Sequence, residues 1–148
     1  MQEAGDSPRQ WCYGCGESNT EGLHIDFDVD GTVVNGRFLP RKPHQGFPGV
    51  THGGIAAAVL DEAMGWAMYA AGAMAMTARM EIRYRRPLPL GEEVRVTAKV
   101  IRDRGRRLEA EARIETASGE VLAEAKGLFL RMPEETSRRF NQSFLGTA

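Results

Sequence analysis

The chain has 148 residues, with 19 basic and 20 acidic side chains and a formal net charge of −1. This length predicts a single domain large enough to bury a hydrophobic core, and the near-zero charge disfavours nucleic acid as a partner. The first ten residues are polar and lack the apolar region of a signal peptide, so we expect a cytoplasmic protein.

Residues 1–11 carry no pattern and are predicted to form a flexible tail. The pair Cys12 and Cys15 follows, in a C-x-x-C spacing that supplies half of a zinc site or a redox pair. The chain has only these two cysteines, so zinc would need histidines, and these are His24, His44 and His52. A redox motif normally opens a helix after a strand, which the surrounding sequence does not provide. We therefore interpret the pair as a structural knuckle without a metal.

Between residues 24 and 40, apolar and polar residues alternate as in a half-buried strand. Ile25, Phe27 and Val29 fall on one side, and three aspartates fall on the other. The dipeptide Asp30-Gly31 is a strong hairpin signal, so residues 32–39 are predicted to return as a second strand. A Gly/Pro-containing loop over residues 41–49 then leads into the most apolar part of the chain.

Residues 53–69 are rich in Ala, Leu and Met and are predicted to form one long helix with Thr51 as its N-cap. The helix is apolar on nearly every side, so it should be buried in the core. Asp61 and Glu62 interrupt it, and two adjacent acids there are costly unless they are paired, solvated or functional. They argue against a membrane span and indicate a functional site.

Four further strands are expected after the helix, because apolar and polar residues alternate around residues 79–85, 94–100 and 108–115 and an apolar run covers residues 121–130. The turns between them suit antiparallel connections. One helix can cover such a sheet if it lies in the concave side of a strongly curved one. The sequence thus predicts an α+β domain over residues 12–132, and a tail over residues 133–148 that includes a short helix.

The motif G-x-x-H-G-G at residues 49–54, followed after six residues by Asp61, resembles the signature of hotdog-fold acyl-CoA thioesterases of the phenylacetate-pathway (PaaI-like) type. Residues 77–91 are similar to the strand and turn that follow in that family, and C-x-x-C-G at residues 12–16 is a common N-terminal decoration of its members. The resemblance covers residues 12–132. It implies the hotdog fold, in which a curved antiparallel sheet wraps one long central helix.

Thioester hydrolysis needs a donor for the developing oxyanion and a base or nucleophile on the other side of the carbonyl. The first N–H groups of a helix lack intrahelical partners, and glycine lets a carbonyl approach them. Gly53 N–H, joined by Gly54, is therefore the candidate oxyanion donor. We expect His52 to orient the loop or the thioester carbonyl.

Asp61 is the candidate base or nucleophile, and Glu62, rotated by about 100° around the helix, is the rival acid whose alternative role is an ion pair with a sheet arginine. Asp61 lies eight residues after Gly53, roughly 12 Å along the axis, so one subunit cannot bring both to one carbonyl. The resemblance implies a homodimer at minimum, and a homotetramer is expected. It also makes Thr77, near the catalytic water, and Gln45, in the loop, candidate site residues.

Residues 79–107 contain ten Lys/Arg against four Asp/Glu, a balance that suits an anionic ligand. Coenzyme A carries a 3′-phosphate and a pyrophosphate, which guanidinium groups recognise well. The candidate substrate-binding residues are Gly54 and the arginines at strand ends and turns, namely Arg85, Arg86, Arg104, Arg106 and Arg107.

The predicted function is hydrolysis of an acyl-CoA thioester to a free acid and coenzyme A, with no cofactor. Two alternatives remain open at this point. A hotdog hydratase or dehydratase is suggested by His44 and residues 47–50, which are faintly similar to the acyl-carrier dehydratases, although the loop spacing differs and His-Gly-Gly is foreign to them. The other is a non-catalytic acyl-CoA-binding protein, which would normally carry a fused DNA-binding or partner domain.

Overall fold

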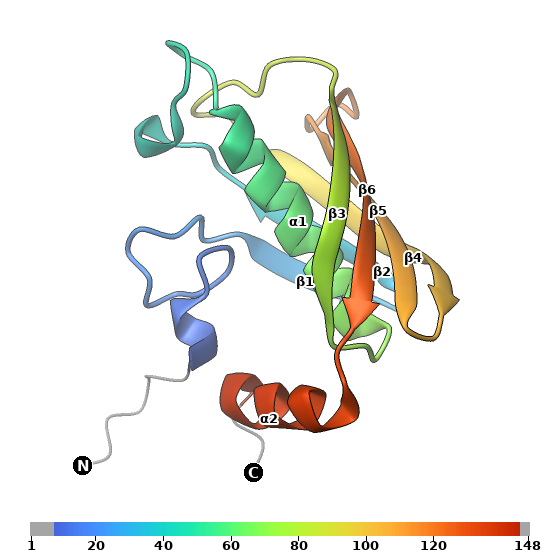
Figure 1. Cartoon of the computed structure of the whole chain (residues 1–148). Helices are drawn as coiled ribbons and strands as arrows, with labels where there is room; N and C mark the ends of the chain where they lie inside the picture. Colours follow the sequence, from blue (N-terminus) through green and yellow to red (C-terminus); the bar gives the residue numbers. More distant parts are fainter. Residues whose placement is uncertain (1–7, 146–148) are drawn as a thin grey trace, which may run out of the picture.

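The structure, a computed structural model, describes residues 8–145, with the side chains of residues 8–142. A long helix, α1 (Gly53–Ala70), lies against one face of a six-stranded antiparallel sheet with the strand order β1-β2-β4-β5-β6-β3 (Figure 1). The strands are β1 (Asp26–Asp30), β2 (Val33–Phe38), β3 (Ala75–Tyr84), β4 (Val94–Arg104), β5 (Arg107–Glu115) and β6 (Val121–Arg131). The hotdog fold that the sequence resemblance implies is confirmed.

The core lies between α1 and the inner face of the sheet, because the alternation along each strand sends small and branched apolar side chains to one side. On α1, Val59, Leu60 and Met64 are fully buried. They face inward residues of the central strands, among them Val96 of β4 and Ile114 of β5. The apolar character of α1 is thus explained by its position in the core, as the sequence predicts.

The N-terminal segment, residues 8–25, lies beside α1 away from the sheet and begins with a short 3₁₀ helix, η1 (Pro8–Trp11) (Figure 1). The N–H groups of Leu23 and Ile25 donate to the carbonyls of Tyr13 and Gly14, which folds the segment on itself. Residues 1–7 of the expected tail lie outside the described residues, but Pro8–Trp11 are helical. The last four residues of the segment predicted as a flexible tail are therefore helical.

The chain ends, within the described residues, in α2 (Glu134–Leu145), which lies beside η1 (Figure 1). This helix accounts for most of the segment that the sequence analysis assigns to a C-terminal tail. No helix among the described residues combines the length and apolar character that crossing a membrane requires.

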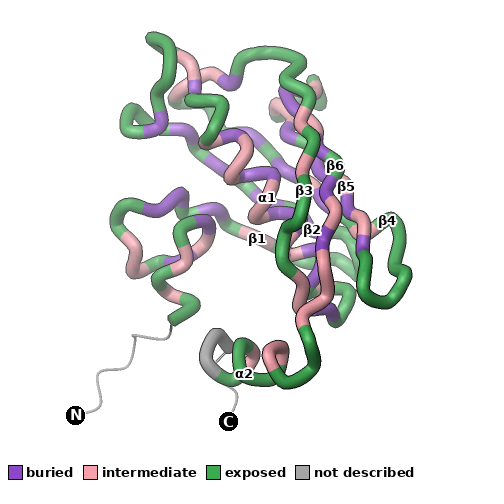
Figure 2. Tube along the Cα trace, viewed as in Figure 1, coloured by how far each residue is buried: buried purple, intermediate pink, exposed green. Residues whose placement is uncertain are grey.

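The strand β3 forms one edge of the sheet, because within the described chain it pairs only with β6. It starts at Ala75, four residues earlier than the alternation predicts, and its register shifts between Thr77 and Arg79. Figure 2 shows this strand exposed over most of its length. The unpaired edge carries hydrogen-bonding groups on which a further strand can pair.

Candidate active site

The first turn of α1 is capped by His52, whose Nδ1 accepts a hydrogen bond of 2.8 Å from the N–H of Gly54. The prediction of Thr51 as the N-cap is wrong, because Thr51 is buried and its hydroxyl has no hydrogen-bond partner in the described structure. The cap also occupies the N–H of Gly54, one of the two expected oxyanion donors. The N–H of Gly53 has no acceptor among the described residues, so it remains available at the positive end of the helix dipole.

The loop before α1 is held by hydrogen bonds from its own residues. Gln45 Oε1 accepts from the N–H of Gly49 at 3.0 Å, so this candidate side chain supports the loop. His44 is buried, its Nδ1 accepts from the N–H of Arg41 at 2.9 Å, and its carbonyl accepts from the N–H of His52. Burial, followed by the charge of Arg41, lowers the pKa of His44. The loop thereby fixes the position of His52 and the start of α1.

Asp61 and Thr77 meet at the exposed edge of the molecule. The Thr77 hydroxyl donates a hydrogen bond of 2.6 Å to Asp61 Oδ1. Asp61 is half-buried on α1, and Thr77 is exposed on β3. The bulge in β3 makes this contact possible, because it shifts the alternation by one residue and turns Thr77 to the side on which Met80 and Ile82 lie. The arrangement orients a carboxylate beside an open strand edge.

Gly53 lies at the other end of β3. The Tyr84 hydroxyl donates a hydrogen bond of 2.7 Å to the carbonyl of Gly53. Sequence reasoning missed Tyr84 as a site residue, although the alternation of β3 places it on the same side as Met80 and Ile82. Each end of β3 is therefore tied to α1. Within one chain Gly53 and Asp61 stay about two helical turns apart, as their spacing predicts.

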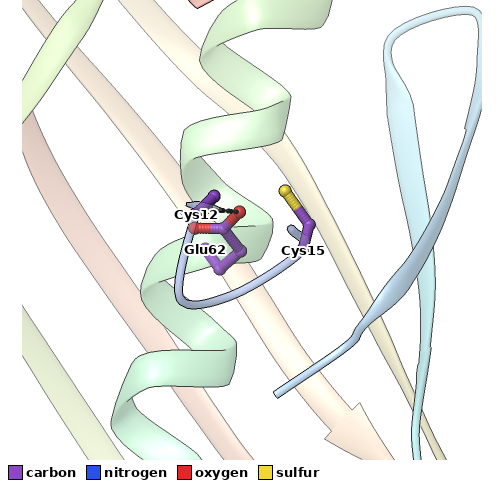
Figure 3. Close-up of side chains that lie close together, drawn as sticks. All are labelled: Cys12, Cys15 and Glu62. Carbon is purple, nitrogen blue, oxygen red and sulfur yellow. Dashed lines mark hydrogen bonds between the residues drawn. The ribbon is translucent and has the colours of Figure 1, made fainter. Parts of the chain in front are cut away.

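Glu62 points away from the sheet towards the N-terminal loop, where it faces Cys12 and Cys15 (Figure 3). The Cys12 thiol donates a hydrogen bond of 3.3 Å to Glu62 Oε1. The alternative role suggested for Glu62, an ion pair with a sheet arginine, is wrong, because the ion pairs of the described residues do not include it. Sequence reasoning treated the cysteines and the helix acid separately, and no local pattern connects them.

The three groups perturb one another. Burial raises the pKa of Glu62 to about 7, and the charge of Cys12 adds to that shift. The pKa of Cys12 is lowered to about 5, mainly by a hydrogen bond from the Cys15 side chain. The same hydrogen bond is the main cause that raises the pKa of Cys15. The two thiols thus titrate as a pair, with Cys12 as the one that ionises first.

The five candidate arginines fall into two groups. Arg85 and Arg86 follow β3 and form ion pairs with Glu124 and Glu120. Arg104, Arg106 and Arg107 lie at the β4–β5 hairpin, and Arg107 is opposite Leu130 near the end of β6. Because Tyr84 pairs with Ala123 near the start of β6, the two groups occupy opposite ends of the sheet. One chain therefore does not gather them around a single ligand.

The architecture and the site define a hotdog-fold protein, and comparisons with known proteins identify the family. The family model described as Thioesterase superfamily matches residues 48–123, which is half of the chain, so the chain belongs to the thioesterase superfamily. The matched region contains Asp61, Thr77, Tyr84 and the glycines at the start of α1.

Individual relatives agree with this assignment. The chain is 34% identical over 94 residues to acyl-coenzyme A thioesterase THEM4 of Bos taurus, covering 63% of this chain and 38% of the relative. It spans about two-fifths of the length of the curated relatives it matches. Among solved structures, the thioesterase superfamily protein RHA08564 has a TM-score of 0.75 at 34% identity, over 78% of this chain and 60% of that chain. The PaaI protein from the E. coli phenylacetic acid degradation operon has a TM-score of 0.70 at 21% identity, over 74% and 84% of the two chains, and shows the same fold.

Proposed function

We propose that the protein is an acyl-CoA thioesterase that hydrolyses an acyl-CoA thioester to a free acid and coenzyme A without a cofactor. The observation that carries the proposal is the Asp61 carboxylate, held by the Thr77 hydroxyl beside the unpaired edge of β3. Membership of the thioesterase superfamily and the name of the THEM4 relatives support the same chemistry.

The active site is proposed to form between two copies of the chain. If two β3 edges pair antiparallel about an axis near Met80 and Glu81, the Thr77 end of one strand lies opposite the Tyr84 end of the other. Asp61 is hydrogen-bonded to Thr77, and Gly53 is hydrogen-bonded to Tyr84. Pairing of the edges therefore carries the Gly53 N–H of one copy towards the Asp61 of the other, which overcomes their separation within one chain.

In this shared site the roles follow from the contacts. Thr77 occupies Oδ1 of Asp61, and the described residues give Oδ2 no hydrogen bond, so Oδ2 is the atom that removes a proton from water or attacks the thioester carbon. The Gly53 N–H, at the positive end of α1, stabilises the oxyanion. His52 is a positioning residue, because its Nδ1 is occupied in capping the helix.

The phosphates of coenzyme A are proposed to contact the β4–β5 hairpin. Arg85 and Arg86 are already neutralised by Glu124 and Glu120. Within the described part of the chain, Arg104, Arg106 and Arg107 have no carboxylate in ion-pair contact. Guanidinium groups that are not already paired are the better ligands for phosphate, because no internal ion pair must be broken first.

The hydratase alternative is disfavoured by the position of His44. Its side chain is buried, and its Nδ1 is occupied by the N–H of Arg41. A substrate bound at Asp61 would have no access to that imidazole in this conformation.

The function is tested by incubating the purified protein with short, long, aromatic and hydroxylated acyl-CoAs and measuring release of free thiol. We expect turnover with at least one class, and a dimer or tetramer in sedimentation at micromolar concentration. Absence of thiol release with all classes would contradict thioesterase activity. A fully active monomer would contradict the shared site.

A further inference from the structure

The side chains of Cys12, Cys15 and Glu62 form a cluster that the proposed hydrolysis does not use. One ligand atom from each residue lies within 4.8 Å of the other two (Figure 3). Two come from the N-terminal loop and the third from the middle of α1. In place of the metal-free knuckle that the sequence suggested, we propose that this cluster is a zinc site, in which two thiolates and the Glu62 carboxylate, instead of histidines, bind the ion and a water molecule completes a tetrahedral set.

The carboxylate of Glu62 has no positively charged partner among the described residues. A carboxylate that is mostly removed from solvent needs a compensating positive charge or strong hydrogen bonds. Glu62 belongs to no ion pair among the described residues, and its side-chain contacts are with the thiols of Cys12 and Cys15, which are weak donors. A divalent ion between the three side chains would supply the missing charge and use every donor atom that converges there.

The N-terminal loop is shaped to close over this carboxylate. A Cβ at Gly14 would lie 2.4 Å from Cδ of Glu62, and a Cβ at Gly16 would lie 2.3 Å from the carbonyl oxygen of Gln10. A side chain at Gly16 would therefore require the backbone to move, and a side chain at Gly14 would push the Glu62 carboxylate away from the loop. The sequence C-x-G-C-G thus combines the two thiols with the two glycines that bring them against Glu62.

The donor set selects the metal. Two sulfur ligands and one carboxylate suit zinc, whereas magnesium and calcium prefer oxygen ligands throughout. Ligand atoms of a tetrahedral zinc site lie about 3.3–3.8 Å apart, as expected for zinc–ligand bonds of about 2.0–2.3 Å. Cys12 Sγ and Glu62 Oε1 are already 3.3 Å apart, and the other two separations are within 4.8 Å, so side-chain rotation has to shorten them by at most about 1.5 Å.

The ion would link the N-terminal segment to α1 next to the proposed active site. The cluster shares Cys12 and Glu62 with a cavity of about 200 Å³ that is also lined by Trp66, Tyr69 and Ala75. Ala75 precedes Thr77 on β3, and Glu62 follows Asp61 on α1. A zinc ion at this position fixes the loop that forms one wall of the cavity, which is a structural role and no part of hydrolysis.

The test is the metal content of protein expressed in zinc-supplemented medium and purified under reducing conditions. We expect about one zinc per chain in the wild type, and loss of the metal from the double variant with Cys12→Ser and Cys15→Ser. Glu62→Gln should weaken zinc binding by at least ~10-fold, because losing a ligand costs no less than losing a group that orients one. Asp61→Asn is the matched control, since it neutralises the neighbouring acid and should retain zinc even if turnover is lost.

Loading the wild-type protein with Co²⁺ gives a second measurement that does not depend on the folding of a variant. Thiolate-to-cobalt charge-transfer absorption should appear on titration and disappear when zinc is added. Three results would overturn the proposal: a wild type that binds neither metal at micromolar concentration, zinc that remains in the double serine variant as an adventitious ion, or a Cys12–Cys15 disulfide in the reduced preparation. None of them bears on thioesterase activity, so the two proposals fail separately.

Discussion

Asp61→Asn separates the chemistry of the proposed site from its geometry. The asparagine Oδ1 can still accept the hydrogen bond that Thr77 donates at 2.6 Å in the wild type, so the side chain should keep its position. The substitution removes the negative charge and the basicity. Any loss of turnover therefore reports on the carboxylate as a base or nucleophile.

A positioned general base contributes roughly 10²–10⁴-fold to a rate, which corresponds to about 2.7–5.4 kcal/mol of transition-state stabilisation. We expect kcat of Asp61→Asn to fall by at least ~10²-fold with the best acyl-CoA in the thiol-release assay. KM should change little, because the hairpin arginines proposed to bind the phosphates are untouched. Single-turnover hydrolysis in heavy-oxygen water by the wild type adds a mechanistic readout: label in Asp61 would identify it as a nucleophile whose mixed anhydride is opened at the aspartyl carbon, because a general base acquires no label.

Asp28→Asn is the control, because Asp28 is an exposed aspartate on β1, outside the proposed site. It should retain the wild-type rate. If Asp61→Asn also stays within about threefold of the wild type, far short of the effect of a lost base, Asp61 is not the catalytic acid. A large loss accompanied by a collapse of the unfolding temperature would likewise contradict the reasoning, because it would assign Asp61 a structural role.

Two further changes test residues around the site. Thr77→Val removes the donor to Asp61, and since a hydrogen bond to a charged group is worth about 1.5–3 kcal/mol, kcat should fall by about 10- to 100-fold, whereas Thr77→Ser should stay near the wild type. His44 has a pKa lowered from 6.5 in the folded state, so below about pH 6.5 the unfolded chain binds more protons and the free energy of unfolding falls. His44→Asn keeps an acceptor near the position of Nδ1, so it should remove the His44 contribution to the fall in the free energy of unfolding, measured by urea unfolding from pH 7.5 to pH 5. If the variant and the wild type show the same dependence of that free energy on pH, His44 is not its cause.

The overall fold was largely predictable because its elements have strong local signals. The run of Ala, Leu and Met predicted a helix over residues 53–69, and the structure places α1 at Gly53–Ala70. The alternation around Asp26–Asp30 and the hairpin signal at Gly31 likewise predicted β1 and β2. The N-cap was wrong because a histidine ring, which is not among the usual capping groups, reaches the N–H of Gly54.

The site was less predictable from the chain's own patterns. Strict alternation from Met80 would turn Thr77 away from the helix, and only the bulge in β3 brings it to Asp61. The resemblance to a known family, not the periodicity, pointed to Thr77. The contact of Glu62 with Cys12 joins residues 50 positions apart, and it depends on how the N-terminal segment packs on α1, which no local pattern encodes.

The proposed sharing of one site by two chains is the central claim, and complementation between two inactive variants tests it most directly. Gly53→Pro removes the N–H proposed as the oxyanion donor. Proline is tolerated at the first helical position, His52 already has the extended ψ of 135° that suits a residue before proline, and a Cβ at Gly53 meets the Tyr84 hydroxyl at an ordinary 3.6 Å. Gly53→Ala, which keeps the N–H, is the matched control and should remain active.

Gly53→Pro and Asp61→Asn are co-expressed with different affinity tags, and the mixed population is assayed for thiol release. Each variant alone should be nearly inactive. If the site is shared, half of the randomly assembled dimers are mixed, and each mixed dimer has one intact site, so the population should recover about one quarter of the wild-type rate. A mixture no more active than the mean of its two parents would contradict the shared site, because Gly53 and Asp61 would then have to act within the same chain.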